Sequence, residues 1–227
     1  MTFCPSMASR LSQRALSEFV NGLRVTDEET VDIVQMVLAG KVNKTLVKLL
    51  ELKGGKAMGI SGMDGNLIEA KMKRPELGYV GSITRVNIQP VMDLLEKGYI
   101  PVISTLGCDD EGHTYNINGD TAAAYIAGAL GAERLIMMTD IAGVLRDKAD
   151  PSTLIPKLTI EETVDLFEKN VINGGMIPKV ECCIDAILRG VESAIIMDGR
   201  VPHSILMEIL TDEGAGTMVV RGKEPEK

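Results

Sequence analysis

An α/β fold is predicted for this 227-residue chain, because short β-rich runs alternate with amphipathic helical segments along most of its length. The run KAMGISG, residues 56–62, is apolar and ends in glycine, as buried strands often do. The segment 159–170 places a threonine three residues before a glutamate, which is the spacing of a helix-starting capping box. This alternation predicts a mostly parallel sheet with helices on both faces, in which ligands bind beyond the carboxyl ends of the strands.

The composition narrows the classes of function. Hydrophobic residues make up 45% of the chain, enough for one or two compact domains, and no apolar run reaches the roughly 18 residues that a membrane span needs. The net charge of −8 argues against nucleic acid as a main partner, because phosphate backbones bind basic faces. The four cysteines form no CxxC pair, which argues against a zinc site or a disulfide framework and favours the cytoplasm.

The first half begins, after an unusual N-terminal segment, with a long helical pattern at residues 26–55. Thr26 and Glu29 have capping-box spacing, and apolar residues such as Val31, Val34 and Leu38 then recur on one helical face. Further elements follow in order, with strands at 56–62, 66–72 and 78–88, a helix at 89–98, a strand at 99–107 and a hairpin at 108–118.

The second half repeats this alternation. Its predicted elements are a helix at 121–130, a strand at 134–140, a loop at 143–156, a helix at 159–170, a glycine-rich loop and helix at 173–190, a strand at 193–199, a helix at 202–212 and a last strand at 216–220. No long Pro/Ser linker divides the chain. The expected organisation is an atypical segment at 1–18, one half at 19–131 and a second half at 132–227.

The N-terminal segment has an unusual composition. It carries Arg10, Arg14 and several serines, and its first acidic residue is Glu18. This composition loosely suggests a transit peptide, which would direct the chain to a plastid. The alternative is a misplaced start or an altered reading frame.

The stretch YNINGD, residues 115–120, combines two amides and a carboxylate just before a helix. Asp120 is predicted to cap the helix that begins at Thr121. Asn116 and Asn118 face the same way on an extended strand, beside a helix N-terminus that favours an anion. One interpretation is the corner of a binding site; the other is a turn and a cap alone.

A second candidate is the stretch NGGMIPKV, residues 173–180. The glycine pair lets the backbone approach a ligand closely, and Pro178 suits the first turn of a helix. Lys179 then lies in a turn where the helix dipole disfavours a cation, so a phosphate partner would explain it. The alternative is a solvated surface lysine.

Two more stretches carry candidate polar groups. Arg24 precedes the first predicted helix, where its guanidinium could bind a carboxylate bidentately or pair with Glu28 or Glu29. Thr139 and Asp140 end a buried strand before a glycine turn, a place suited to a ribose or base contact and equally to an ordinary strand exit. No Walker P-loop or GxGxxG motif is present, so the residues alone indicate an α/β enzyme that binds a small anion.

Seven stretches in order resemble the N-acetylglutamate kinases of the amino acid kinase family. They are FVNGLRVTD, GKVNKTLVKLL, GISGMDGNLI, YNINGDTAA, TDIAGVL, GGMIPKV and DEGAGTM, and the likeness runs from about Phe19 to about Val220. The resemblance implies a three-layer αβα sandwich and phosphorylation of the γ-carboxylate of N-acetyl-L-glutamate by ATP. It also implies that 19–131 is the half for substrate binding and dimerisation and 132–227 the half that binds ATP.

The resemblance implies roles for single residues. Arg24, Asn116 and Asn118 would bind the substrate, Asp120 would orient the catalytic lysines, and Lys179 would stabilise the transferring phosphoryl group. The residues expected to bind ATP are Thr139, Asp140, Gly143, Leu145, Asn173, Gly175 and Met176. Mg²⁺ would accompany ATP, held largely by its phosphates, with no metal site of the protein's own and no tightly bound cofactor.

Two glycine-rich phosphate-binding stretches of this family are not found. Residues 1–17 stand where a Gly-Gly-Gly-Pro-Glu-Ile loop is expected, and Gly119 stands where alanine is usual. We therefore expect little activity from this chain alone, and a non-catalytic regulatory relative is the alternative hypothesis. The resemblance also implies a homodimer, an L-arginine effector site at Glu208 and Gly214, and a nitrogen-regulatory PII partner. The lack of the family's N-terminal helix argues against a hexamer.

Overall fold

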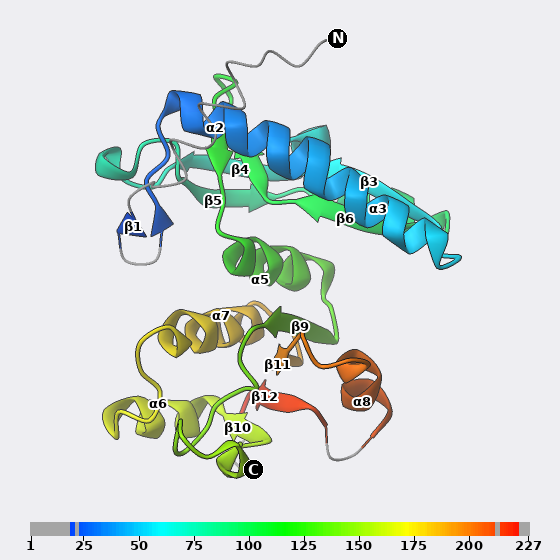
Figure 1. Cartoon of the computed structure of the whole chain (residues 1–227). Coiled ribbons are helices and arrows are strands. Elements are labelled where there is room, and N and C mark those ends of the chain that lie inside the picture. The colour runs from blue at the N-terminus through cyan, green and yellow to red at the C-terminus, as the bar shows by residue number, and fades with distance from the viewer. Residues whose placement is uncertain (1–18, 21–22, 212–213, 223–227) are drawn as a thin grey trace, which may run out of the picture. The chain divides into compact units, whose positions relative to one another are not determined.

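The computed structural model describes residues 19–20, 23–211 and 214–222, with the backbone alone for 19–20 and 23–24. Contacts divide the chain into two compact units, one up to Ala122 and one from Ala123 (Figure 1). The division falls inside helix α5 (Gly119–Leu130), near its start, whereas the sequence places the boundary just after this helix. The prediction for residues 1–18 lies outside the described part of the chain.

The first unit contains a long helical run. It comprises α2 (Glu28–Gln35), a π-helical stretch (Met36–Val42) and α3 (Asn43–Leu52), and α3 packs on strands β3 (Ala57–Ser61) and β6 (Ile100–Ser104) (Figure 1). A shorter helix, α4 (Gln89–Glu96), also contacts β6. Two single 3₁₀ turns lie at Asp64–Asn66 and Pro75–Leu77.

The described strands of the first unit form three sheets. Strands β1 (Phe19–Val20) and β2 (Leu23–Arg24) are antiparallel, and β3 and β6 are parallel. The third sheet has the order β5-β4-β7-β8, made of β5 (Gly81–Val86), β4 (Ile68–Met72), β7 (Leu106–Cys108) and β8 (Thr114–Asn116). The predicted hairpin at 108–118 is confirmed by the antiparallel pairing of β7 with β8.

Asn43 fastens the helical run to the parallel strand pair. Its side chain is 2% exposed, and its amide nitrogen donates to the carbonyl oxygens of Ile60 at 3.0 Å and Val102 at 2.8 Å. Those carbonyls belong to β3 and β6, so one buried amide joins both strands to α3. A Cβ on Gly59 would lie 1.8 Å from the Asn43 amide oxygen, which explains the glycine on β3.

The described strands of the second unit form one four-stranded sheet of order β10-β12-β11-β9. Its strands are β9 (Arg134–Thr139), β10 (Lys157–Thr159), β11 (Ser193–Asp198) and β12 (Gly216–Val220). Its helical elements are most of α5, α6 (Ile160–Glu168), α7 (Met176–Leu188), α8 (Ser204–Leu210) and a 3₁₀ turn at Pro151–Thr153. All its strand pairs are parallel except β11 with β12. The chain thus has the predicted α/β class, with mixed rather than purely parallel sheets.

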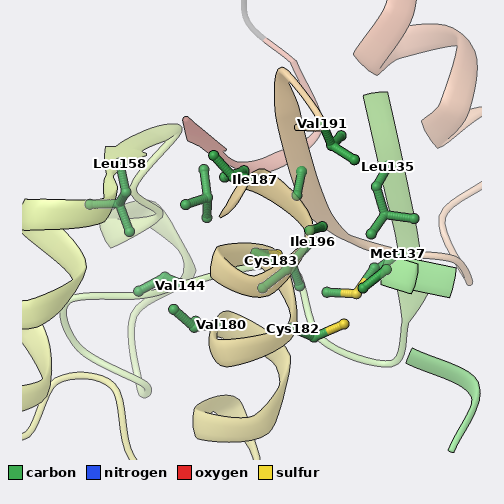
Figure 2. Close-up of a cluster of buried hydrophobic side chains, with 14 of the residues drawn as sticks. Leu135, Met137, Val144, Leu158, Val180, Cys182, Cys183, Ile187, Val191 and Ile196 are labelled. Carbon is green, nitrogen blue, oxygen red and sulfur yellow. The ribbon is translucent and has the colours of Figure 1, made fainter. Parts of the chain in front are cut away.

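The core of the second unit lies between α7 and this sheet. Val180, Cys183 and Ile187 come from α7 and pack with Ile196 of β11 and Leu135 of β9 (Figure 2). The apolar residues of α7 recur at helical spacing, so one face of the helix is buried. This packing holds α7 and the carboxyl ends of β9 and β11 in one body.

The two predicted capping boxes have different outcomes. At α6 the prediction is confirmed, because Thr159 Oγ1 accepts from Glu162 N and the Glu162 carboxylate accepts from Thr159 N. At α2 it is wrong: the cap is Asp27, whose carboxylate accepts from Thr30 N at 2.8 Å, while Thr26 is completely buried. The described part of the chain contains no helix with the length and apolar character that a membrane span requires.

Candidate active site

A cavity of about 380 Å³ opens at the carboxyl end of β9 in the second unit. Its walls come from the loop after β9, the loop before α7 and the first turn of α7. The lining residues are Asp140, Ile141, Ala142, Gly143, Val144, Leu145, Lys148, Val171, Asn173, Gly175, Met176 and Lys179. All but one of the residues predicted to bind ATP therefore meet around one cavity, together with Lys179. Thr139, the last residue of β9, is not among the lining residues.

The loop after β9 is held at both ends. At its start, Thr139 Oγ1 accepts a hydrogen bond from Ile141 N at 3.0 Å, so this hydroxyl shapes the turn. At its end, Val144 N donates to Thr217 Oγ1 at 2.8 Å, and that hydroxyl donates to Ile155 O at 2.7 Å. Thr217 is completely buried. Sequence reasoning missed it, because a single threonine in a final strand gives no signal.

Gly143 allows this loop to pass close to β12. Its φ of +143° is one that side-chain-bearing residues rarely adopt, and a Cβ there would lie 2.5 Å from Thr217 Oγ1. The sequence prediction of a glycine turn after Thr139–Asp140 is confirmed, and its close approach to β12 is the physical reason for the glycine.

The part of the lining that comes from the loop before α7 is built around Asn173. Its amide nitrogen donates to Asn170 O at 2.7 Å, and its amide oxygen accepts from the ammonium group of Lys148. Lys148 is exposed and was not predicted from the sequence; a lysine in the loop 143–156 was the available signal. Lys179, the fourth residue of α7, adds a second ammonium group to the lining.

In the first unit, Asn116 ends strand β8 beside the segment that follows β2. Its backbone N–H donates to Tyr79 O at 2.8 Å, and its side-chain amide donates to Thr26 Oγ1 at 3.3 Å. Thr26 N in turn donates to Leu77 O. Asn116 and the end of β2 are thus brought close through Thr26, two residues after Arg24. The prediction for the Arg24 guanidinium lies outside the described atoms.

The predicted cap of α5 is wrong by two residues. The helix begins at Gly119, and the amide oxygen of Asn118 accepts from Thr121 N at 3.0 Å and from Thr121 Oγ1 at 3.2 Å. Asn118 is therefore the capping residue, and Asp120 lies in the first turn. Buried Ile117 separates Asn116 from Asn118 on the chain, as the alternation of an extended strand requires.

A polar cluster closes the hairpin between β7 and β8. The Asp109 carboxylate accepts from Tyr115 OH at 2.8 Å and from His113 N at 2.9 Å, and lies 3.0 Å from His113 Nδ1. Burial alone would raise the pKa of Asp109, but these hydrogen bonds outweigh it and lower the pKa to about 2. Burial and the Asp109 carboxylate raise the pKa of Tyr115 to about 12.

Glu208 and Gly214 lie together in the second unit. The Glu208 side chain accepts from Ala215 N at 2.6 Å, and Glu208 is 6% exposed. A Cβ on Gly214, where φ is +68°, would lie 3.0 Å from the same carboxylate. Within the described ranges, His, Cys, Asp and Glu side chains form no group of three that could hold a metal ion.

The chain belongs to the amino acid kinase family, whose family model matches residues 6–198. It is 55% identical over 204 residues to the acetylglutamate kinase of Thermosynechococcus vestitus, covering 89% of this chain and 69% of that protein. It is 53% identical over 209 residues to the acetylglutamate kinase of Clostridioides difficile, covering 92% and 73%.

Two solved structures support the same fold. The Streptococcus mutans protein smu.665 superposes with a TM-score of 0.78 at 28% identity, covering 95% of this chain and 82% of that one. The N-acetylglutamate synthase of Neisseria gonorrhoeae, solved with coenzyme A and N-acetyl-glutamate, superposes with a TM-score of 0.79 at 26% identity, covering 96% and 50%.

Proposed function

We propose that this chain serves the ATP-dependent phosphorylation of the γ-carboxylate of N-acetyl-L-glutamate, which gives N-acetylglutamyl phosphate in arginine biosynthesis. The observation that carries the proposal is the identity of 55% with an acetylglutamate kinase over 89% of this chain. Sequence reasoning reached the same activity from seven short stretches. The relatives named here give no support to the alternative of a non-catalytic relative.

The cavity in the second unit supports nucleotide binding. Its glycine-rich loop, its two lysines and its apolar residues suit a ligand with a flat aromatic base and a phosphate tail. Lys179 would stabilise charge on the transferring phosphoryl group, and Asn173, held by Lys148, would contact the nucleotide. ATP would bring Mg²⁺ with it, bound largely by the phosphate oxygens.

The polar groups of the first unit support carboxylate binding. Arg24, Asn116 and Asn118 would bind N-acetylglutamate, and Asp120 would orient the catalytic lysine without touching the phosphate. The acceptor is already a carboxylate, so the reaction needs no general base. Phosphoryl transfer depends on positioning and on neutralised charge, which these residue types provide.

We further propose a homodimer in the cytoplasm, with Glu208 and Gly214 as contacts for an L-arginine effector. The buried Glu208 carboxylate packs closely beside Gly214, where a Cβ would lie 3.0 Å from it, and this arrangement supports the effector site. A PII signal protein remains a proposed partner on the basis of the family resemblance alone.

Binding by calorimetry tests the nucleotide half first. ADP should bind the chain, and Lys179→Ala should lower the affinity for ADP by about tenfold or more, which is the effect expected from one charge-assisted hydrogen bond. Adenosine, which lacks phosphate, should bind both variants equally. Failure of the unaltered chain to bind ADP would overturn the nucleotide site. A separate assay should trap N-acetylglutamyl phosphate with hydroxylamine and measure its dependence on both substrates.

Two substitutions separate the capping role of Asn118 from substrate binding. Asn118→Ser keeps an oxygen that can cap α5 and removes the amide donors, so stability should hold while N-acetylglutamate binds more weakly. Asn118→Ala removes both and should also cost about 1 kcal/mol of stability. Equal N-acetylglutamate affinity in the original chain and in Asn118→Ser would limit this residue to capping.

A further inference from the structure

We propose that Arg200 is a positioning residue of the nucleotide site. Its guanidinium, fixed by Asp198, holds the backbone carbonyl of Asp140 and so keeps the loop at 140–145 in its binding conformation. The inference deepens the proposed function, because this loop forms one wall of the cavity assigned to ATP. Neither the sequence motifs nor the cavity lining includes Arg200.

The Arg200 guanidinium makes three hydrogen bonds that fix its orientation. Arg200 Nε donates to Asp198 Oδ1 at 2.9 Å, and one terminal nitrogen donates to Asp198 Oδ2 at 2.8 Å. The same terminal nitrogen donates to the carbonyl oxygen of Asp140 at 2.6 Å. A bidentate pair fixes the plane of a guanidinium, so Asp198 aims Arg200 at a carbonyl 60 residues away in the sequence.

The backbone around Arg200 supports this arrangement. Asp198 pairs with Thr139 at the carboxyl ends of the parallel strands β11 and β9, and Gly199 N donates to Thr139 O at 2.8 Å. Arg200 N also donates to Asp198 Oδ1 at 2.9 Å, which folds the turn back on itself. The side chain therefore bridges two neighbouring strand ends, which is where ligands bind in sheets of this type.

The two ends of the loop are held unequally. At the far end, the completely buried Thr217 hydroxyl fixes Val144, as described above. At the near end, the turn depends on the Thr139 hydroxyl and on Arg200, whose side chain is 69% exposed. Loss of Arg200 should therefore loosen residues 140–143 and leave Val144 in place. A loosened wall binds its ligand less tightly, because the conformational entropy lost in ordering the loop then opposes binding.

Because Arg200 is exposed, its effect on the loop can be tested without a large change in global stability. An ion pair this exposed contributes little to global stability, so Arg200→Ala should fold with a melting temperature close to that of the original chain. Arg134→Ala is the matched control, since Arg134 is an exposed arginine at the opposite end of β9. Arg200→Lys keeps the positive charge but cannot reproduce the planar bidentate contact.

Calorimetry with ADP and amide hydrogen exchange of the unliganded chain provide the two readouts. Arg200→Ala should lower the affinity for ADP about three- to tenfold, which is the effect expected from one hydrogen bond, and Arg200→Lys should not restore it. Exchange of the Ile141 and Ala142 amides should accelerate in both variants, with no change at Ile155 and no change anywhere near this loop in Arg134→Ala.

Three results would overturn the proposal. They are unchanged exchange at residues 140–143 in Arg200→Ala, unchanged ADP affinity in that variant, and full recovery of affinity in Arg200→Lys, which would indicate charge attraction alone. If the unaltered chain does not bind ADP, the proposed function fails, and the exchange readout then decides by itself whether Arg200 holds the loop. Asp198→Ala should reproduce the exchange change, and adding it to Arg200→Ala should cause no further change.

Discussion

In the unit from Ala123 onward, one four-stranded sheet packs against α7 across a continuous apolar core, whereas the unit up to Ala122 divides its described strands among three sheets. In that first unit a buried amide, Asn43, joins the parallel strand pair to its covering helix. The same helix, α3, leaves the apolar residues Leu46, Leu49 and Leu52 exposed.

This difference extends to the candidate site. The cavity proposed to bind nucleotide is shaped by close backbone packing, as at Gly143 and Thr217, and its loop is anchored by a buried hydroxyl. The proposed substrate residues are arranged by hydrogen bonds, Asn116 with Thr26 and Asn118 with Thr121. Steric packing constrains a loop more tightly than partly exposed hydrogen bonds, so we expect the two units to respond differently to substitution.

The largest expected effect is in the core of the second unit. Ile196→Ala truncates a completely buried side chain at the centre of the sheet and should lower the free energy of unfolding by about 2–5 kcal/mol. Leu52→Ala, at a side chain that is 70% exposed, should change stability by about 0.5 kcal/mol or less. Urea denaturation measures both. A comparable loss at Leu52 would contradict the comparison and would indicate that this face of α3 is covered in solution.

A smaller but still large effect is expected at Gly143. Gly143→Ala places a Cβ against Thr217 at a strained φ and should cost about 1–3 kcal/mol, together with most ADP affinity. Gly119→Ala is the control, because no atom lies within 4 Å of its Cβ position and φ is not positive there. Thermal unfolding and calorimetry should find Gly119→Ala unchanged or slightly stabilised. Equal behaviour of the two variants would show that the loop does not need its glycine.

The buried amide of the first unit gives the next prediction. Asn43→Ala leaves the Ile60 and Val102 carbonyls without their side-chain donor and should cost about 1–3 kcal/mol. Lys48→Ala, an exposed substitution on the same helix, serves as the control. Amide exchange on β3 and β6 should accelerate in Asn43→Ala, while exchange on β11 stays constant. An equal acceleration on β11 would mean that the two units do not open separately.

The smallest effect is expected at the hairpin, and it depends on pH. Tyr115→Phe removes the hydroxyl that helps to lower the pKa of Asp109, so stability should fall by about 1 kcal/mol at neutral pH. The depressed Asp109 pKa contributes stability above its ordinary value of 3.8, and this contribution disappears as pH falls through about 2. The raised Tyr115 pKa contributes stability below pH 10, the ordinary pKa of tyrosine, and this contribution is lost as pH rises through about 12.

The difference between Tyr115→Phe and the original chain should therefore be constant from about pH 4 to pH 10 and shrink outside that range. Stability measured by urea denaturation across this range checks the shape of the profile. A difference that grows below pH 4 would rule out the Asp109–Tyr115 hydrogen bond as its cause.

Much of the fold follows from local sequence patterns. Apolar runs and glycine ends place β3, β6 and β9, and the pair Thr159–Glu162 locates the start of α6 correctly. The same spacing at Thr26–Glu29 fails, because Thr26 is buried against Gly78 and Asn116 and the neighbouring Asp27 takes the capping role. A local motif predicts a cap only when tertiary contacts leave its side chain available.

The α/β class, the kinase family and most residues around the cavity of the second unit could be predicted from the amino-acid sequence, since these depend on periodicity and on short contiguous stretches. The side chains that hold those stretches in place could be identified only from the folded structure. Thr217, Lys148 and Arg200 act on loops that are 25 to 73 residues away in the chain. Their partners become neighbours only when separate strands and loops pack together, and no local pattern in the sequence records that distance.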